Sequence, residues 1–107
     1  MARFIYRMQS ILDIKAKMEE QAKMEFAAAR MHLDEEEEKL QILKNRKASY
    51  EDKGRELRKD SLKVMEIMEN RDAIARMEEF IAFQMQQVRL AEEQLEEARY
   101  KLQVARQ

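Results

Sequence analysis

Apolar side chains recur along the first half of the chain at the heptad spacing that keeps one face of a helix against a partner helix. One phase places Ile5, Leu12, Glu19, Phe26, Leu33, Leu40, Lys47 and Gly54 at the a positions and Met8, Lys15, Ala22, Ala29, Glu36, Leu43, Tyr50 and Leu57 at the d positions. Most of these residues are apolar. The pattern predicts one long helix with a hydrophobic seam, the stripe of a and d positions.

The same phase fails in the second half of the chain, where it would place Arg89, Glu96 and Gln103 at a positions. From Ile67 onward a shifted phase restores the pattern. Its a positions are Ile67, Ile74, Ile81, Val88, Leu95 and Leu102, all apolar, and its d positions are Asn70, Met77, Gln84, Ala91, Ala98 and Ala105. A break in phase between two strongly periodic segments indicates a turn between two helices.

The best turn residues lie at 58–61, where Asp60 or Ser61 can cap a new helix by accepting from its free N–H groups. Gly54 is a weaker turn candidate, because glycine within a helix costs only about 1 kcal/mol relative to alanine. The sequence therefore predicts a first helix over about 3–57, a turn at about 58–61 and a second helix over about 62–107. The expected fold is all-α, a long antiparallel two-helix coiled-coil hairpin that forms a single domain over 1–107.

Composition supports long helices and narrows the classes of function. The 107 residues include one Gly, no Pro and no Cys, and 40% are charged, with a formal net charge of −1. So few turn residues exclude a sheet protein, and the balanced charge gives no general attraction to nucleic acid or anionic lipid. The longest apolar runs have four residues, so neither a membrane span nor a cleaved signal segment is expected.

No residue group assembles recognisable catalytic or ligand chemistry. The acidic run 34–38 fans around a helix axis, whereas calcium needs oxygens converging on one point, so a solvated face is favoured. His32 is the only histidine and lacks a nucleophile nearby. The basic stretch 44–59 contains one aromatic residue, Tyr50, which belongs to the seam, so nucleic-acid binding is disfavoured. The chain is expected to be no enzyme and to need no metal and no cofactor.

Two apolar features exceed what a two-helix seam requires. Near the N-terminus, Phe4, Ile11 and Met18 occupy successive g positions and Ile14 a c position. In the second helix, Phe80 at g and Phe83 at c lie beside Met77. Broader packing within the hairpin or a homodimer contact would explain both features; otherwise such clusters mark partner sites.

Antiparallel pairing around a turn at 58–61 would place residue 107 opposite about residue 12. Phe4, Ile5, Met8 and Ile11 would then have no partner within the hairpin. Either the natural chain continues past Gln107 or another protein covers this end.

The residues resemble the FliJ family of flagellar export proteins in its Gram-positive form. The opening FIYRMQSILDIKAKMEEQAKMEFAAAR has the aromatic pair Phe4 and Tyr6, then Met8-Gln9 and the segment 11–15, and EEEEKL follows at 35–40. The stretch AIARMEEFIAFQMQQVRLAEEQLEEARYKL fits the family's second helix. The resemblance covers essentially the whole chain, as a member shortened at its C-terminal end.

The resemblance implies a stalk-like coiled coil of the flagellar type III export apparatus. Such a protein would dock into the hexameric export ATPase, link it to the cytoplasmic part of the transmembrane export gate, and serve export substrates as a chaperone or escort, with export chaperones as further partners. It would lie at the cytoplasmic face of the inner membrane without inserting into it. The ATPase contact maps to Phe4, Arg7, Met8, Ile11, Leu12, Ile14 and Lys15, and the gate contact to Ala73, Met77, Phe80 and Gln84. Ala73 departs from the larger apolar residue expected there.

A second interpretation comes from a different functional class. A generic coiled-coil scaffold, or a prefoldin-like hairpin that holds unfolded chains with its open ends, would show the same heptads. Suppression of aggregation of unrelated proteins would distinguish it from a stalk that binds one ATPase.

Overall fold

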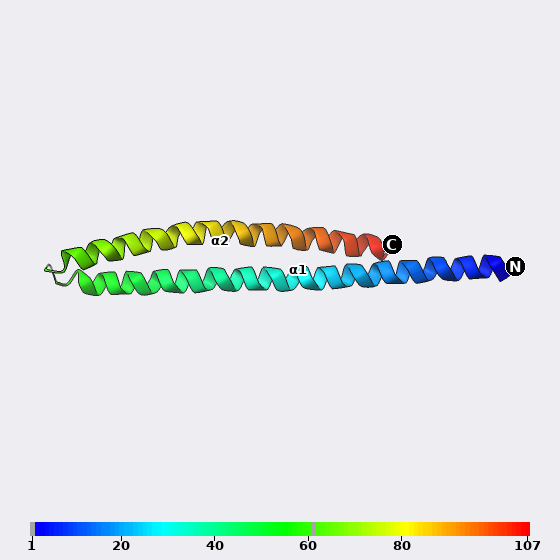
Figure 1. Ribbon diagram of the computed structural model, residues 1–107, viewed down its shortest axis with the longest axis horizontal. Helices are drawn as coiled ribbons and strands as arrows, with labels where there is room; N and C mark the ends of the chain where they lie inside the picture. The colour runs from blue at the N-terminus through cyan, green and yellow to red at the C-terminus, as the bar shows by residue number, and fades with distance from the viewer. Residues whose placement is uncertain (1, 61) are drawn as a thin grey trace. The chain divides into compact units, whose positions relative to one another are not determined.

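The computed structural model describes residues 2–60 and 62–107. It consists of two helices, α1 (Ala2–Leu57) and α2 (Val64–Ala105), drawn in Figure 1, and the described residues contain no strand. No helix among them is both long and apolar enough to cross a membrane. The prediction of an all-α fold is confirmed. The chain forms two compact units, each with a segment of both helices: unit 1 is Met1–Leu33 with Ala91–Gln107, and unit 2 is Asp34–Leu90.

In unit 2 the end of α1 and the start of α2 lie side by side and are joined by the turn (Figure 1). Two hydrogen bonds between the helices define their direction. The Asn70 amide Nδ2 donates to the Tyr50 carbonyl oxygen at 2.9 Å, and the Gln84 amide Nε2 donates to the Glu36 carbonyl oxygen at 3.0 Å. Higher numbers in α2 meet lower numbers in α1, so the helices run antiparallel, as predicted for a coiled-coil hairpin.

In unit 1 the last turns of α2 pack against α1 well inside its N-terminus. Lys15 Nζ donates to the carbonyl oxygen of Gln107 at 3.1 Å, and Arg106 Nε lies 3.6 Å from Glu19 Oε1. The first turns of α1 extend past the end of α2 (Figure 1). Through its long side chain Lys15 reaches Gln107, close to residue 12, the residue expected opposite this end.

Burial follows the two heptad phases. The buried apolar side chains all occupy a or d positions: Ala22, Leu57, Val88, Ala91, Leu95, Ala98 and Leu102. The buried polar side chains, Glu36, Asn70 and Gln84, are all at d. A one-layer seam of this kind is what a strict a/d pattern produces. Many large apolar side chains outside it stay exposed.

The turn differs in detail from the sequence expectation. Asp60 Oδ1 accepts from the Leu62 N–H at 3.0 Å, and the Asp60 carbonyl oxygen accepts from the Lys63 N–H at 3.3 Å. Both bonds precede the first residue of α2, Val64. Asp60 therefore closes the turn instead of capping the helix. The alternative cap, Ser61, lies outside the described residues.

Gly54 is no turn residue but a buried residue of α1, at an a position facing Asn70. A Cβ atom on Gly54 would lie 2.5 Å from Asn70 Oδ1. The missing side chain therefore makes room for the Asn70 amide group, which needs that place to reach the Tyr50 carbonyl oxygen. Its cost in helix propensity is offset by this contact.

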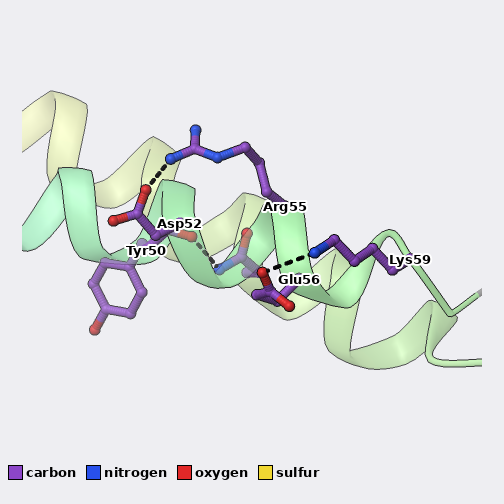
Figure 2. A network of polar contacts seen from close by, with 6 residues as sticks. Tyr50, Asp52, Arg55, Glu56 and Lys59 are labelled. Atoms are coloured by element: carbon purple, nitrogen blue, oxygen red, sulfur yellow. Dashed lines mark hydrogen bonds and ion pairs between the residues drawn. The ribbon is translucent and has the colours of Figure 1, made fainter.

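Figure 2 shows the polar groups near this end of α1. Arg55 pairs with Asp52, and Lys59 Nζ lies 3.1 Å from Glu56 Oε1. All four side chains are exposed, so each pair contributes only about 0.2–0.5 kcal/mol. The part-buried bond between Asn70 and Tyr50 is therefore the more important contact for holding the two helices together at this level.

Replacing Gly54 by Ala is expected to destabilise the hairpin by about 1 kcal/mol. Overpacking against Asn70 costs roughly 1–3 kcal/mol and exceeds the helix-propensity gain. In the Asn70→Ala background the clash is gone, so Gly54→Ala should stabilise by about 1 kcal/mol. Thermal unfolding followed by circular dichroism measures both. If Gly54→Ala changes the stability in the same direction in both backgrounds, Gly54 does not serve to make room for Asn70.

Candidate interaction surfaces

The first surface is the N-terminal face, the apolar side of α1 over residues 4–18 in unit 1. Along this stretch the side chains at a, d and g positions are exposed, including Phe4 at 67% and Ile11 at 62%. From Glu19 onward the side chains at a and d positions of α1 are buried or half-buried, except Tyr50, which is 37% exposed. The helix therefore continues its seam pattern into a region that α2 does not cover.

All seven residues expected at the ATPase contact lie on this exposed stretch: Phe4, Arg7, Met8, Ile11, Leu12, Ile14 and Lys15. Lys15 lies beside the end of α2, where its ammonium group donates to the Gln107 carbonyl oxygen. The structure thus brings these residues together on one helix with a mixed apolar and cationic character.

The second surface is the aromatic shoulder, Phe80 and Phe83 on α2 in unit 2. Their side chains are 52% and 61% exposed, and residues three apart share one side of a helix. Of the other positions expected at the gate contact, Ala73 and Met77 are half-buried and Gln84 is buried. Phe83 belongs with Phe80 by geometry although the family resemblance did not assign it.

Gln84 lies in the seam, where it forms a polar layer with Glu36. Its amide Nε2 donates to the Glu36 carbonyl oxygen and also to the carboxylate oxygen Oε2. Lys39 Nζ lies 3.2 Å from the other carboxylate oxygen. Glu36 is only 8% exposed, so the expectation of a solvated acidic run is wrong at this residue. Its d position turns it toward α2, and the Gln84 amide satisfies it there.

Unit 1 also contains two grooves between α1 and α2. One is mainly apolar and is lined by Met18, Gln21, Ala22, Glu25, Tyr100, Lys101, Val104 and Ala105. The other, on the opposite side, is lined by Lys23, Phe26, Arg99, Leu102, Gln103 and Arg106. Sequence reasoning did not single out Tyr100 and Val104. Tyr100 occupies an f position and Val104 a c position, beside Lys101 at g. Apolar side chains at these outer positions are the sequence feature that could have indicated the groove.

Among residues 2–60 and 62–107 no group of three His, Asp or Glu side chains could hold a metal ion. Two antiparallel helices with a one-layer seam and separate exposed apolar surfaces define a coiled-coil interaction protein.

The family model for the flagellar FliJ protein matches residues 4–107, so the chain belongs to this family. It is a component of the flagellar export apparatus, and the family is non-catalytic. The identification suggested by the sequence is confirmed. No curated protein and no solved structure matches the chain.

Substitutions at Glu36 and Gln84 should be strongly coupled. Gln84→Leu removes the amide donor from a buried carboxylate, and the expected loss of stability is about 1–3 kcal/mol. Glu36→Leu removes the carboxylate acceptor but leaves the amide its bond to the backbone carbonyl oxygen of residue 36, so it should cost less. The double variant replaces the pair by an apolar layer and should be at least as stable as the natural chain.

Urea unfolding of the four proteins gives the coupling energy. If the stability change of the double variant equals the sum of the two single changes to within about 0.5 kcal/mol, Glu36 and Gln84 do not act as a pair.

Proposed function

We propose that this protein docks into the hexameric flagellar export ATPase through the N-terminal face and contacts the cytoplasmic part of the transmembrane export gate through the aromatic shoulder. The observation that carries the proposal is the exposure of the N-terminal face on a helix whose seam pattern continues there. Membership of the FliJ family supports the choice of partners.

The exposed apolar and cationic side chains of the N-terminal face suit an end that is inserted into the ATPase ring. Covering one large apolar side chain contributes roughly 1.5–3 kcal/mol, and Phe4, Ile11 and Leu12 are all more than half exposed. Arg7 and Lys15 flank them and can pair with carboxylates on the inner surface of a ring. Because salt screens exposed charges, the affinity should fall as ionic strength rises.

The gate contact rests on Phe80, with Phe83 beside it. Gln84 and Met77 act from within the seam, where they position the turn of α2 that presents Phe80. Ala73 lies half-buried on the same g stripe, about two helical turns before Phe80. Its small side chain limits what it can add to a contact.

We further propose that residues 1–107 act as one hairpin domain, since α1 and α2 each run through both units. The proposed place of action is the flagellar base, at the cytoplasmic face of the inner membrane, because both proposed partners are found there. An escort role toward export substrates or chaperones would use the same exposed apolar surfaces.

Deleting residues 2–12 should abolish binding to the purified ATPase hexamer and stimulation of its ATP turnover. Ile11→Asp should cause most of this loss alone, because it introduces a charge that would be buried in the complex. Charge reversal at Arg58, an exposed turn residue, is the matched control and should change nothing. A pull-down read alongside ATP turnover is the measurement.

If the deletion variant binds the ATPase as well as the natural chain, or the Arg58 variant loses binding, then the turn end and not the N-terminal end contacts the ATPase. Suppression of aggregation of unrelated unfolded proteins, without ATPase binding, would favour a general holdase instead.

Phe80→Asp should abolish binding to the cytoplasmic region of the export gate while leaving the melting temperature nearly unchanged, because Phe80 is half exposed. Ile81→Asp, at the neighbouring a position, should unfold the protein by burying an unpaired charge. Circular dichroism and a binding assay with the isolated gate region measure the two effects. If both variants lower the melting temperature by the same amount, Phe80 is a structural residue and the proposed gate contact at the aromatic shoulder is wrong.

A further inference from the structure

The g positions of α1 change character where α2 begins to cover the helix. Phe4, Ile11 and Met18 are apolar, whereas the g positions that follow are Glu25, His32, Lys39, Arg46 and Lys53. A strict a/d pattern is typical of a helix with one partner, and an apolar face widened to g is typical of a helix packed in a bundle. Residues 4–18 therefore have a face wide enough for two neighbouring helices.

The apolar g positions continue into the groove between the helices of unit 1. Met18 lines that groove together with Ala22, and α2 contributes Tyr100, Val104 and Ala105 to it. Tyr100 is 67% and Val104 49% exposed. The g-side track, defined as Phe4, Ile11, Met18, Tyr100 and Val104, is thus a line of apolar side chains, first on α1 alone and then between α1 and α2.

Charge along the α1 part of the g-side track indicates the chemistry of what would cover it, while the groove adds one side chain of each sign, Glu25 and Lys101. On its outer edge, at c and f positions, lie Arg3, Arg7 and Lys17, and residues 3–18 place no carboxylate at these positions. Asp13, the acid of this stretch, is at b on the far side of the helix. An occupant with carboxylates beside its apolar stripe is therefore favoured. A second copy that packed its own g-side track against this one would bring its cations against these three.

We infer that unit 1 binds one amphipathic, acid-flanked helix of a partner protein, which lies along the g-side track as a third helix beside α1 and α2. The inference rests on the proposed function in taking the N-terminal face as the docking site. It adds the structural class of the partner element and extends the site to Tyr100 and Val104. Heptad spacing of the anchors on α1 is the spacing that a helical partner would match.

A pair of synthetic three-heptad peptides tests the inference on the full chain. Both have leucine at their a and d positions; one is flanked by Glu and the other by Lys. Fluorescence anisotropy with labelled peptide should show the Glu-flanked peptide binding about tenfold more tightly. Val104→Glu should weaken it by about tenfold, while Gln103→Glu, one residue away on the opposite side of α2, should leave the affinity unchanged.

Absence of binding, equal affinity of the two peptides, or equal loss in both variants would overturn the inference. Concentration-dependent dimerisation of the chain that Val104→Glu abolishes would also overturn it, in favour of a second copy. The ATPase pull-down is a separate readout. If the natural chain binds the Glu-flanked peptide but not the ATPase, ring docking is refuted and the third-helix site stands. If it binds the ATPase but not the peptide, only the third-helix site is refuted.

Discussion

The structure depends on a seam one layer thick, in which the a and d side chains of α1 from Glu19 onward pack against a single facing helix. Within unit 2 two polar layers hold that seam in one register. Asn70 bonds to Tyr50 and Gln84 to Glu36, and the two layers are two heptads apart on both helices. A slip of one helix past the other would break both at once. Polar core residues specify register at a cost in stability, and that cost is lowered when every group finds its partner.

The Asn70 layer shows how local preferences yield to this constraint. A glycine within a helix is locally unfavourable, yet Gly54, near the end of α1, leaves the space that Asn70 occupies. The ion pairs near the turn are exposed and add little. Stability in this region therefore comes from cross-helix contacts in the seam rather than from surface charge.

The thin seam also explains why so much apolar surface remains available for binding. Two helices cover only a and d positions, so Phe4 and Ile11 at g and Phe83 at c cannot be buried by the hairpin itself. In a larger bundle such residues would be core. In a FliJ-family hairpin they are free to meet other components of the export apparatus, which is the basis of both proposed contacts and of the third-helix site.

The sequence by itself determined the helices, both heptad phases and the exposure of the N-terminal face, because the seven-residue period of apolar side chains is a property of each helix alone. Which residues oppose each other was decided by the tertiary structure. Register is set by contacts between the helices, which place Asn70 opposite Tyr50 and Gln84 opposite Glu36. The Glu36–Gln84 bond, the space at Gly54 and the groove at Val104 all follow from that pairing across two helices, which no periodicity within one helix records.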